Sequence, residues 1–303
     1  MKRLFILVIM AFSYALNAQS QSIESYSELG LMLGTSYYTG DLNDQHFRLA
    51  QPSSSIQYKT NLNRRFALRG SLSLGEIRGS DKLNNIDTAK FNRNLHFKSS
   101  IYELSGVVEF NFFPYETGNK RYPFTPYIFS GLSLFNFNPQ ARQTDTQNPF
   151  DRDGNDSNNP WLDLQPLGTE GQYSTRYPEK EPYQLIQVAI PIGFGIKASL
   201  GDKLSIALEY GMRKIFTDYI DDVGGIYASP QYLAMENIDA ATLSDRSNAL
   251  QEFLEANPGA DITTWTGNTN RQRANENDWT DWYYFTGLTI SYRIYTKSKV
   301  CQY

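Results

Sequence analysis

The stretch LIQVAIPIGFGIKAS, residues 185–199, alternates strictly between two kinds of side chain. One face carries Ile186, Val188, Ile190, Ile192, Phe194 and Ile196. The other face carries Gln187, Ala189, Pro191, Gly193, Gly195 and Lys197. A period of two predicts a β-strand, because successive side chains of a strand point to opposite faces. The alternation continues from Ile186 to Ile196, which is longer than a typical strand in a soluble domain.

The same alternation recurs along the chain in seven further runs. These are residues 28–39, 53–62, 65–77, 100–113, 124–138 and 203–216, and a last run from Trp282 to Ile294. The gaps between successive runs alternate long and short: 40–52, 63–64, 78–99, 114–123, 139–184, 200–202 and 217–281. Transmembrane barrels alternate in this way because one end carries short periplasmic turns and the other carries extended outer loops. Residues 19–295 are therefore predicted to form an all-β fold, an eight-stranded antiparallel transmembrane β-barrel with long outer loops at 139–184 and 217–281.

The N-terminus predicts export. Lys2 and Arg3 precede an apolar run from Leu4 to Leu16, and a plausible cleavage site follows Ala18. We expect residues 1–18 to be a cleaved signal peptide and the mature chain to lie in the outer membrane of a bacterium. Beyond residue 18, no apolar stretch approaches the roughly 20 residues that a membrane-spanning helix needs.

Composition excludes several functional classes. The 28 Lys and Arg residues against 32 Asp and Glu leave a net charge of −4, without the basic excess of a nucleic-acid-binding protein. Cys301 is the only cysteine, and His46 and His96 are the only histidines. A disulfide framework, a cysteine-based metal site and a multi-histidine centre are therefore excluded, and no cofactor is expected.

Charged residues avoid the predicted lipid-facing sides of the strands. A charge at mid-depth in the hydrocarbon costs about 2–4 kcal/mol, and an eight-stranded barrel is just wide enough to be filled by its own side chains. We therefore expect the charges of the opposite faces to form salt bridges inside a closed lumen, although a proton or ion path is the alternative. The charges are Arg69, Glu103, Glu109, Lys197, Glu209, Arg213 and Arg293.

Aromatic residues make up 14% of the chain and need a place in this barrel. Several rings stand near the predicted strand ends, where barrels carry interfacial aromatic girdles. They are Phe112, Phe113, Tyr115, Phe135 and Phe137. Run 124–138 is apolar on both faces, so the pattern does not decide its orientation.

The outer loops offer weak candidates for metal binding. Residues 151–155, DRDGN, resemble the start of a calcium loop, but the glycine is fourth instead of sixth and Leu162 replaces the bidentate glutamate. Asp218, Asp221 and Asp222 form a second acidic group, for which capping of the loop by hydrogen bonds is the simpler interpretation.

Catalysis finds little support in the sequence. A Ser-His-acid lipid hydrolase would need a histidine at the rim, and His96 with Ser99 or Ser100 is the one arrangement available. No nucleophile elbow accompanies it, so we do not expect an enzyme. Residues 229–254 have helical spacing of apolar side chains, which predicts one or two short surface helices in the last loop.

Eight blocks resemble one known family, in order and at suitable spacing. They are NLHFKS at 94–99, EFNFFPYE at 109–116, FTPY at 124–127, NPQA at 138–141, LQPLGTEGQ at 164–172, PYQLIQ at 182–187, RKIFTDYIDDV at 213–223 and DWYYFTG at 281–287. Over roughly residues 23–295 the chain thereby resembles PorG-type proteins of the Bacteroidetes. The tail at 296–303 runs on past the last strand with Lys297, Lys299 and Cys301, and Tyr292 and Tyr295 could serve as the aromatic residues that barrels place near the chain end.

This resemblance implies an outer-membrane component of the type IX protein secretion machinery, which also supports gliding in some species. It implies as partners a PorK-like lipoprotein and a PorN-like protein of the periplasmic ring, beside outer-membrane lipid. It supplies no catalytic residue or cofactor.

The family and the closed barrel together suggest an anchor for the ring. Turn 114–123 is the longest of the three short connections and is the best docking candidate, through Tyr115, Glu116, Lys120, Arg121 and Tyr122. A periplasmic turn that merely carries interfacial anchors is the simpler interpretation. The alternative function is a free-standing small barrel that acts as an adhesin or surface-binding protein.

Overall fold

Eight long antiparallel strands form a closed barrel in this computed structural model, which describes residues 25–83, 87–143, 159–274 and 281–294. The strands are β1 (Tyr26–Thr39), β2 (Gln51–Asn61), β3 (Phe66–Ser80), β4 (His96–Asn111), β5 (Phe124–Arg142), β7 (Ile186–Leu200), β8 (Leu204–Ile215) and β9 (Trp282–Ile294). Each strand pairs with its neighbours along the chain, and β1 pairs with β9 to close the ring. A short strand, β6 (Trp161–Asp163), extends the free edge of β5. The predicted eight-stranded barrel is confirmed.

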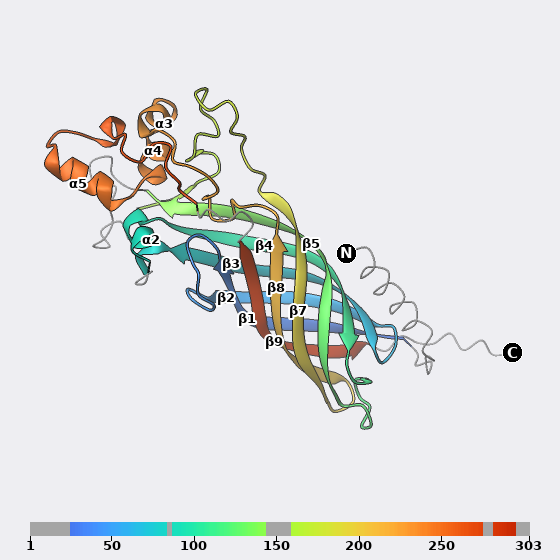
Figure 1. The fold of residues 1–303 in the computed structure, drawn as a ribbon. Helices are drawn as coiled ribbons and strands as arrows, with labels where there is room; N and C mark the ends of the chain where they lie inside the picture. The colour runs from blue at the N-terminus through green and yellow to red at the C-terminus, as the bar shows by residue number, and fades with distance from the viewer. Residues whose placement is uncertain (1–24, 84–86, 144–158, 275–280, 295–303) are drawn as a thin grey trace, which may run out of the picture.

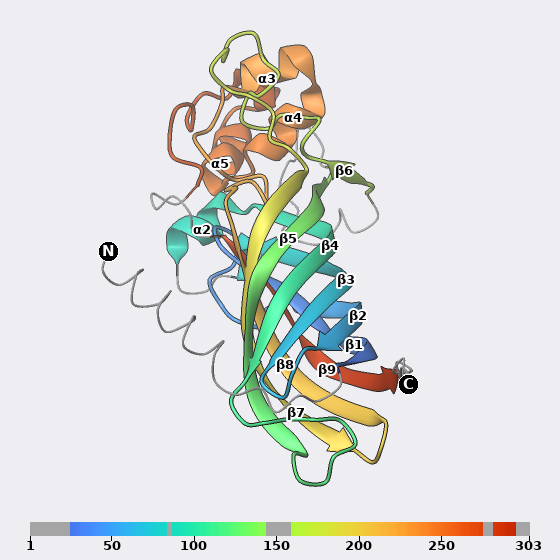
Figure 2. The ribbon, with the colours of Figure 1, turned by 90° about the vertical axis from the view of Figure 1, so that its right-hand side faces the viewer.

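Long and short connections lie at opposite ends of the barrel, as Figures 1 and 2 show. Residues 62–65, 112–123 and 201–203 connect strands at one end, here called the turn end. The described parts of segments 40–50, 81–95, 143–185 and 216–281 belong to the other, the loop end. Within the described ranges, four helices stand at the loop end: α2 (Thr88–Arg93), α3 (Pro230–Glu236), α4 (Ile238–Ser244) and α5 (Asn248–Ala256), with 3-10 turns η1 (Asp81–Leu83) and η3 (Ile262–Thr264). Helices α3 to α5 confirm that the last loop carries short helices, although there are three of them where one or two were expected.

The outside of the barrel is a continuous apolar band. Its side chains occupy alternate strand positions and are about half exposed, for example Leu31, Ile56, Leu72, Leu104, Leu132, Ile192, Leu208 and Ile290. A soluble protein rarely exposes an apolar surface of this extent, whereas the hydrocarbon of a membrane requires it. The barrel is therefore of the transmembrane type. Among the described residues, no helix is long and apolar enough to cross a membrane.

Some of the aromatic rings expected in the girdles lie inside the barrel instead. Phe112 and Phe113 are exposed at the turn end, but Tyr115, Phe135 and Phe137 are almost completely buried. The girdle prediction was wrong for these three rings. Strand β5 is apolar on both faces, so only its pairing with β4 and β7 decided which side turned inward.

Candidate functional site

Charged side chains fill the middle of the lumen. The Arg69 guanidinium on β3 contacts Glu109 Oε1 on β4 at 3.0 Å and Glu209 Oε2 on β8 at 2.5 Å. Lys197 Nζ on β7 lies 2.8 Å from Glu109 Oε2. The Tyr127 hydroxyl donates to Glu209 Oε2 at 2.8 Å. These contacts join strands from opposite walls of the barrel.

Two further ion pairs extend this network along the lumen. Arg213 donates from Nε and Nη2 to Glu103 at 3.1 Å each, and the Tyr283 hydroxyl donates to Glu103 Oε2 at 2.6 Å. Lys59 Nζ lies 2.7 Å from Glu28 Oε2. Glu28 and Lys59 were absent from the predicted set, because the alternation in their two strands is weak. Their direct opposition in the β1–β2 pair is the signal that sequence analysis overlooked.

The lumen network is neutral as a whole. Four carboxylates balance four cations, counted from Glu28, Glu103, Glu109 and Glu209 against Lys59, Arg69, Lys197 and Arg213. Burying unpaired charges is prohibitively costly, so such a set is stable only when its members are paired. The arrangement is that of a filled lumen. Arg293 lies apart, at the turn end, with its guanidinium 4.0 Å from the Tyr26 ring centroid and 3.8 Å from Glu116 Oε1.

An apolar plug replaces the charges toward the loop end. Its buried side chains include Met32, Ile77, Ile101, Phe135, Phe137, Ile215 and Phe285. A row of stacked rings continues it upward: Phe137 lies 6.1 Å from Tyr183, and Tyr183 lies 4.9 Å from Tyr219. The plug therefore joins the barrel wall to the long loops.

The turn between β4 and β5 folds back into the barrel mouth. Tyr115 is buried, and the Thr117 hydroxyl donates to the Glu28 carboxylate of the lumen network. The Gly118 N–H donates to Ser199 Oγ at 2.8 Å. Gly118 has φ +88°, and a Cβ there would lie 2.3 Å from the Asp202 carbonyl oxygen, so the turn requires glycine at this position.

The five predicted docking residues occupy different environments in this turn. Tyr115 is buried, whereas Lys120 and Arg121 are exposed. Glu116 is half-buried and accepts from Arg64 at 3.2 Å, while the Arg64 guanidinium lies 4.5 Å from the half-buried Tyr122 ring. The surface that the turn offers to a partner is thus cationic, and the other residues hold it rigidly.

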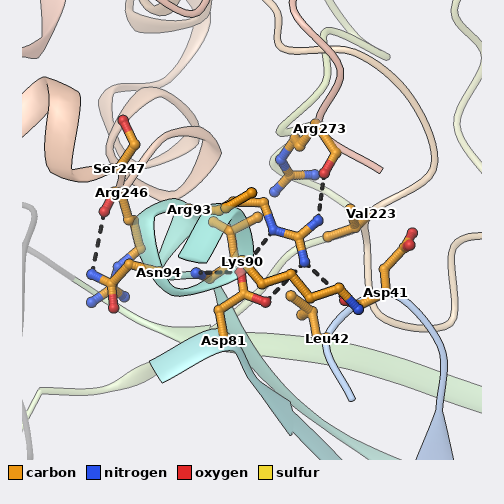
Figure 3. A network of polar contacts seen from close by, with 12 residues as sticks. Asp41, Leu42, Asp81, Lys90, Arg93, Asn94, Val223, Arg246, Ser247 and Arg273 are labelled. Atoms are coloured by element: carbon orange, nitrogen blue, oxygen red, sulfur yellow. Dashed lines mark hydrogen bonds and ion pairs between the residues drawn. The ribbon is translucent and has the colours of Figure 1, made fainter. Parts of the chain in front are cut away.

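Arg93 connects three long loops at the loop end, as Figure 3 shows. Its Nε and Nη2 donate to the Asp81 carboxylate at 2.7 and 2.8 Å. The same guanidinium donates to the carbonyl oxygens of Arg273, at 2.6 Å, and Asp41, at 2.9 Å. One side chain on α2 thereby ties the β3–β4 loop to the β1–β2 and β8–β9 loops.

Arg273 adds the fourth loop. Its Nη1 donates to Glu170 Oε1 at 3.0 Å, and its Nη2 lies 3.7 Å from Asp222 Oδ2. Asp222 also accepts from Thr169 Oγ1 at 2.5 Å and from the Tyr183 hydroxyl at 2.8 Å. We call Arg93, Arg273 and these carboxylate partners the arginine clasp. The blocks at 164–172 and 213–223 meet in the arginine clasp, which gives them a structural role in the cap, meaning the described long loops and helices at the loop end.

Two of the three aspartates after β8, Asp221 and Asp222, contact different partners. Asp222 faces Arg273, while Asp221 accepts from the Tyr38 hydroxyl at 2.5 Å. Burial raises the pKa of Asp222 to about 6, despite the opposing effect of Arg273. Burial and the nearby Asp41 also raise the pKa of Asp221. Within the described ranges, no cluster of three or more His, Cys, Asp or Glu side chains could hold a metal ion.

His96 and its neighbouring serines do not form a catalytic pair. His96 Nε2 accepts from the Arg142 backbone N–H at 3.1 Å. Ser99 points into the lumen, on the opposite face of β4 from His96. Ser100 shares the outer face but is four residues away, which is about 13 Å along a strand. The candidate calcium loop at 151–155, the signal peptide and the tail at 296–303 lie outside the described residues.

A family model matches the first half of the chain. The model is DUF6089, a domain of unknown function, and it matches residues 2–158. The chain belongs to the DUF6089 family. Within the described residues, the DUF6089 match includes strands β1 to β5 with Arg69, Glu103 and Glu109, and helix α2 with Arg93.

Several solved structures are similar to this DUF6089 chain at low identity. Ail of Yersinia pestis, in complex with the heparin analogue sucrose octasulfate, is 8% identical with a TM-score of 0.39, over 90% of this chain and 100% of that one. Neisserial surface protein A is 7% identical with a TM-score of 0.37, over 89% and 97%. OprG of Pseudomonas aeruginosa is 10% identical with a TM-score of 0.32, over 90% and 95%. The sequence matches none of the curated proteins with which it was compared.

Proposed function

We propose that this chain is a non-enzymatic outer-membrane component of the type IX secretion and gliding machinery, and that it anchors the periplasmic ring to the outer membrane. The observation that carries the proposal is a filled, neutral lumen inside an apolar outer band. Such a barrel holds a position in the membrane firmly. It offers no path wide enough for a folded cargo protein.

The distribution of the loops supports an orientation. In outer-membrane barrels the short turns face the periplasm and the long loops face outward. By this rule the turn end of this chain meets the periplasm, and the arginine clasp with helices α2 to α5 lies outside the cell. The partners suggested by the PorG-type resemblance, a PorK-like lipoprotein and a PorN-like ring protein, are on the periplasmic side.

The β4–β5 turn is the best docking element at the periplasmic end. It is the longest of the three short connections, and its anchoring through Thr117 and Gly118 fixes its position. It exposes Lys120 and Arg121 side by side. A rigid cationic surface favours an acidic surface on the partner, because complementary charges guide association and fix the orientation of docking.

Charge reversal tests this docking surface. We expect the double variant K120E/R121E to reduce recovery of ring proteins with the tagged barrel about tenfold or more, since two attractive contacts become repulsive. The measurement is mild detergent extraction followed by mass spectrometry of the co-purified proteins. Lys203→Glu in the β7–β8 turn is the matched control, because Lys203 is also exposed at the turn end. Unchanged recovery from the double variant would contradict docking at this turn.

The cap gives a second candidate function some support. A groove of about 560 Å³ lies beside α2 and α5 and is lined by residues that include Asp87, Lys90, Asn248, Glu252 and Arg271. Facing outward, such a groove suits a surface-binding protein or adhesin that acts alone. The same extraction distinguishes the two functions, because an adhesin would purify without ring proteins.

A further inference from the structure

Two buried carboxyl groups meet a single hydroxyl group beneath the cap. Tyr38 Oη, at the loop end of β1, lies 2.5 Å from Asp221 Oδ2 and 3.2 Å from Asp281 Oδ1. Asp221 lies in the loop segment after β8, and Asp281 directly precedes β9. Tyr38 is completely buried, and the two aspartates are each 1% exposed. These contacts tie β1 to both ends of the β8–β9 loop.

The hydroxyl has one hydrogen and cannot serve two carboxylates. Its shorter contact identifies Asp221 as the acceptor, and Asp221 Oδ1 accepts a further hydrogen bond from the Val223 N–H at 3.0 Å. Asp281 Oδ1 then faces the oxygen of a hydroxyl whose hydrogen points elsewhere. An ionised carboxylate can only accept, whereas a protonated carboxyl can donate. The geometry therefore favours a protonated Asp281 that donates to Tyr38.

Nearby carboxyl groups also favour a retained proton. Two more of them act on Asp281, those of Asp41 in the β1–β2 loop and Asp218 in the β8–β9 loop. Among the described residues, Asp281 Oδ2 has no hydrogen-bond partner, an arrangement that is costly for a buried charged group. Burial and the adjacent Asp221 raise the pKa of Asp281 well above its usual range.

Three other ionisable groups face this carboxyl pair from neighbouring elements. They are Arg93 on α2, Lys214 on β8 and Tyr183, which precedes β7. Arg93 makes its ion pair with Asp81, and the Tyr183 hydroxyl donates to Asp222. Within the described ranges, neither cation forms an ion pair with either member of the carboxyl pair. Both cations therefore act only from a distance.

The carboxyl pair lies where the base of the β1–β2 loop packs against the β8–β9 loop. A Cβ at Gly40 would clash with Asp281 Oδ1 and with the Tyr38 hydroxyl. The Leu42 N–H donates to Tyr38 Oη at 3.5 Å. Leu42 and Val223, which Figure 3 shows beside the arginine clasp, are buried members of the apolar plug. Separation of the two carboxyl groups would loosen both loops and expose the top of the plug.

We propose that Tyr38, Asp221 and Asp281 form a proton-dependent latch, which holds the β1–β2 loop and both ends of the β8–β9 loop together while one carboxyl is protonated and releases them when both are ionised. Two ionised carboxylates around one hydroxyl repel each other, and one of them lacks a donor. The latch is a property of the folded cap, so it operates whether or not ring proteins bind at the turn end.

The direction of the pH dependence follows from the raised pKa values of Asp221 and Asp281. A carboxyl with a raised pKa in the closed cap stabilises that state fully below its ordinary pKa, and this stabilisation is lost as the pH rises through the raised value. The latch is therefore closed at low pH and opens as the pH rises.

Hydrogen exchange of the cap tests the latch. The barrel is placed in lipid vesicles at about pH 5 and about pH 9, and the amides of segments 40–43 and 218–224 are followed by mass spectrometry. Their protection factors, which correct for the intrinsic pH dependence of exchange, should fall about tenfold or more in the unaltered chain at the higher pH. The amides of β8 below the cap should not change.

Asp281→Asn is the decisive variant. The Asn amide can still donate to Tyr38 but cannot ionise, so the protection factors should stay nearly constant between the two pH values. Asp44→Asn is the matched control, because Asp44 lies in the same β1–β2 loop with a side chain that is 49% exposed, and it should keep the full fall. Asp222 titrates in all three chains, so its contribution cancels in the comparison.

Two further measurements keep the outcome unambiguous. Infrared difference spectroscopy should show a carboxylic acid band in the unaltered chain at about pH 7 that is absent from Asp281→Asn, since the latch retains its proton there. Tyr38→Phe, with heat-modifiable migration as the check of folding, should lower protection at about pH 5 roughly tenfold, because both carboxyls lose their shared partner. An equal fall in protection for Asp281→Asn and the unaltered chain, no such infrared band, or unchanged protection in Tyr38→Phe would each overturn the latch.

Discussion

The two halves of the barrel lumen are filled by different means. Toward the turn end, ion pairs such as Arg69–Glu209 and Lys197–Glu109 span the lumen and connect residues 140 and 88 positions apart in the chain. Toward the loop end, Ile77, Phe135 and the other members of the apolar plug pack without charge. An ion pair requires a specific partner in a specific place, whereas apolar packing requires mainly volume. The charged half therefore fixes opposite walls relative to one another, and the apolar half supports the cap.

Removing one charge from the lumen half near the turn end is the strongest test of this difference between the two halves. Glu109→Gln keeps the shape but leaves Arg69 and Lys197 without a carboxylate that both contact. We expect a loss of about 3–5 kcal/mol in the free energy of unfolding, because a buried charge loses its partner. The measurement is urea unfolding of the barrel in detergent micelles or lipid vesicles.

The control for this variant is an ion pair at the rim. Arg78 is bound to Glu76 at 2.6 Å, but the Arg78 side chain is 43% exposed. Exposed pairs contribute less than about 1 kcal/mol, so Arg78→Gln should change unfolding little. If both variants lost the same free energy of unfolding, burial would not be the reason that the lumen network stabilises the barrel.

At the loop end, the buried Asp222 carboxyl should make the free energy of unfolding depend on pH. The pKa of Asp222 in the fold is about 6, above its ordinary value of 3.8, so the folded chain holds this proton more tightly than the unfolded chain. The contribution of Asp222 to stability is therefore fully present below about pH 4 and is lost as the pH rises through about 6, by up to about 3 kcal/mol.

Asp222→Asn should remove this component of the pH dependence. The readout is the difference in free energy of unfolding between the unaltered chain and the variant, measured from pH 4 to pH 7 in lipid vesicles. The unaltered chain should show the steeper fall with rising pH. Parallel curves would contradict the raised pKa, whatever other groups titrate in the same range.

Shortening one side chain in the apolar plug should have the smallest effect. Ile77 is completely buried, so Ile77→Val removes one buried methylene and should cost about 1 kcal/mol. Ile56→Val is the same change on the lipid-facing side, where Ile56 is 58% exposed and a lipid chain can fill the gap. The free energy of unfolding of Ile56→Val should equal that of the unaltered chain within error. A cost at Ile77 as large as that of Glu109→Gln would erase the contrast between the halves.

Sequence reasoning reached the barrel because its evidence is local. Alternation in a run such as 185–199 follows from the geometry of a single strand, and each loop length is read directly from the gap between runs. The same alternation assigned Glu109 and Lys197 to the inward face of their strands, opposite the lipid-facing side chains. Glu28 and Lys59 were missed because their strands alternate weakly, although they face each other directly across one hairpin.

The site details depended on contacts that no local pattern carries. Phe135 and Phe137 were expected at the membrane boundary and lie in the plug, because pairing of β5 with both neighbours set the orientation of a strand that is apolar on both faces. Arg93 and Arg273 had no signal at all. Each arginine lies in a polar loop segment, and its partners come from other loops that meet it only in the folded chain.

By itself, the sequence determined the number of strands, the segregation of long and short connections and the apolar character of the outer band, since period-two alternation and loop length are properties of neighbouring residues. Only the tertiary structure decided which carboxylate meets which cation, that Tyr115 closes the turn end, and that Tyr38 stands between Asp221 and Asp281. Those partners lie tens to hundreds of positions apart in the chain. Their meeting depends on the closure and register of the whole barrel, which no single segment specifies.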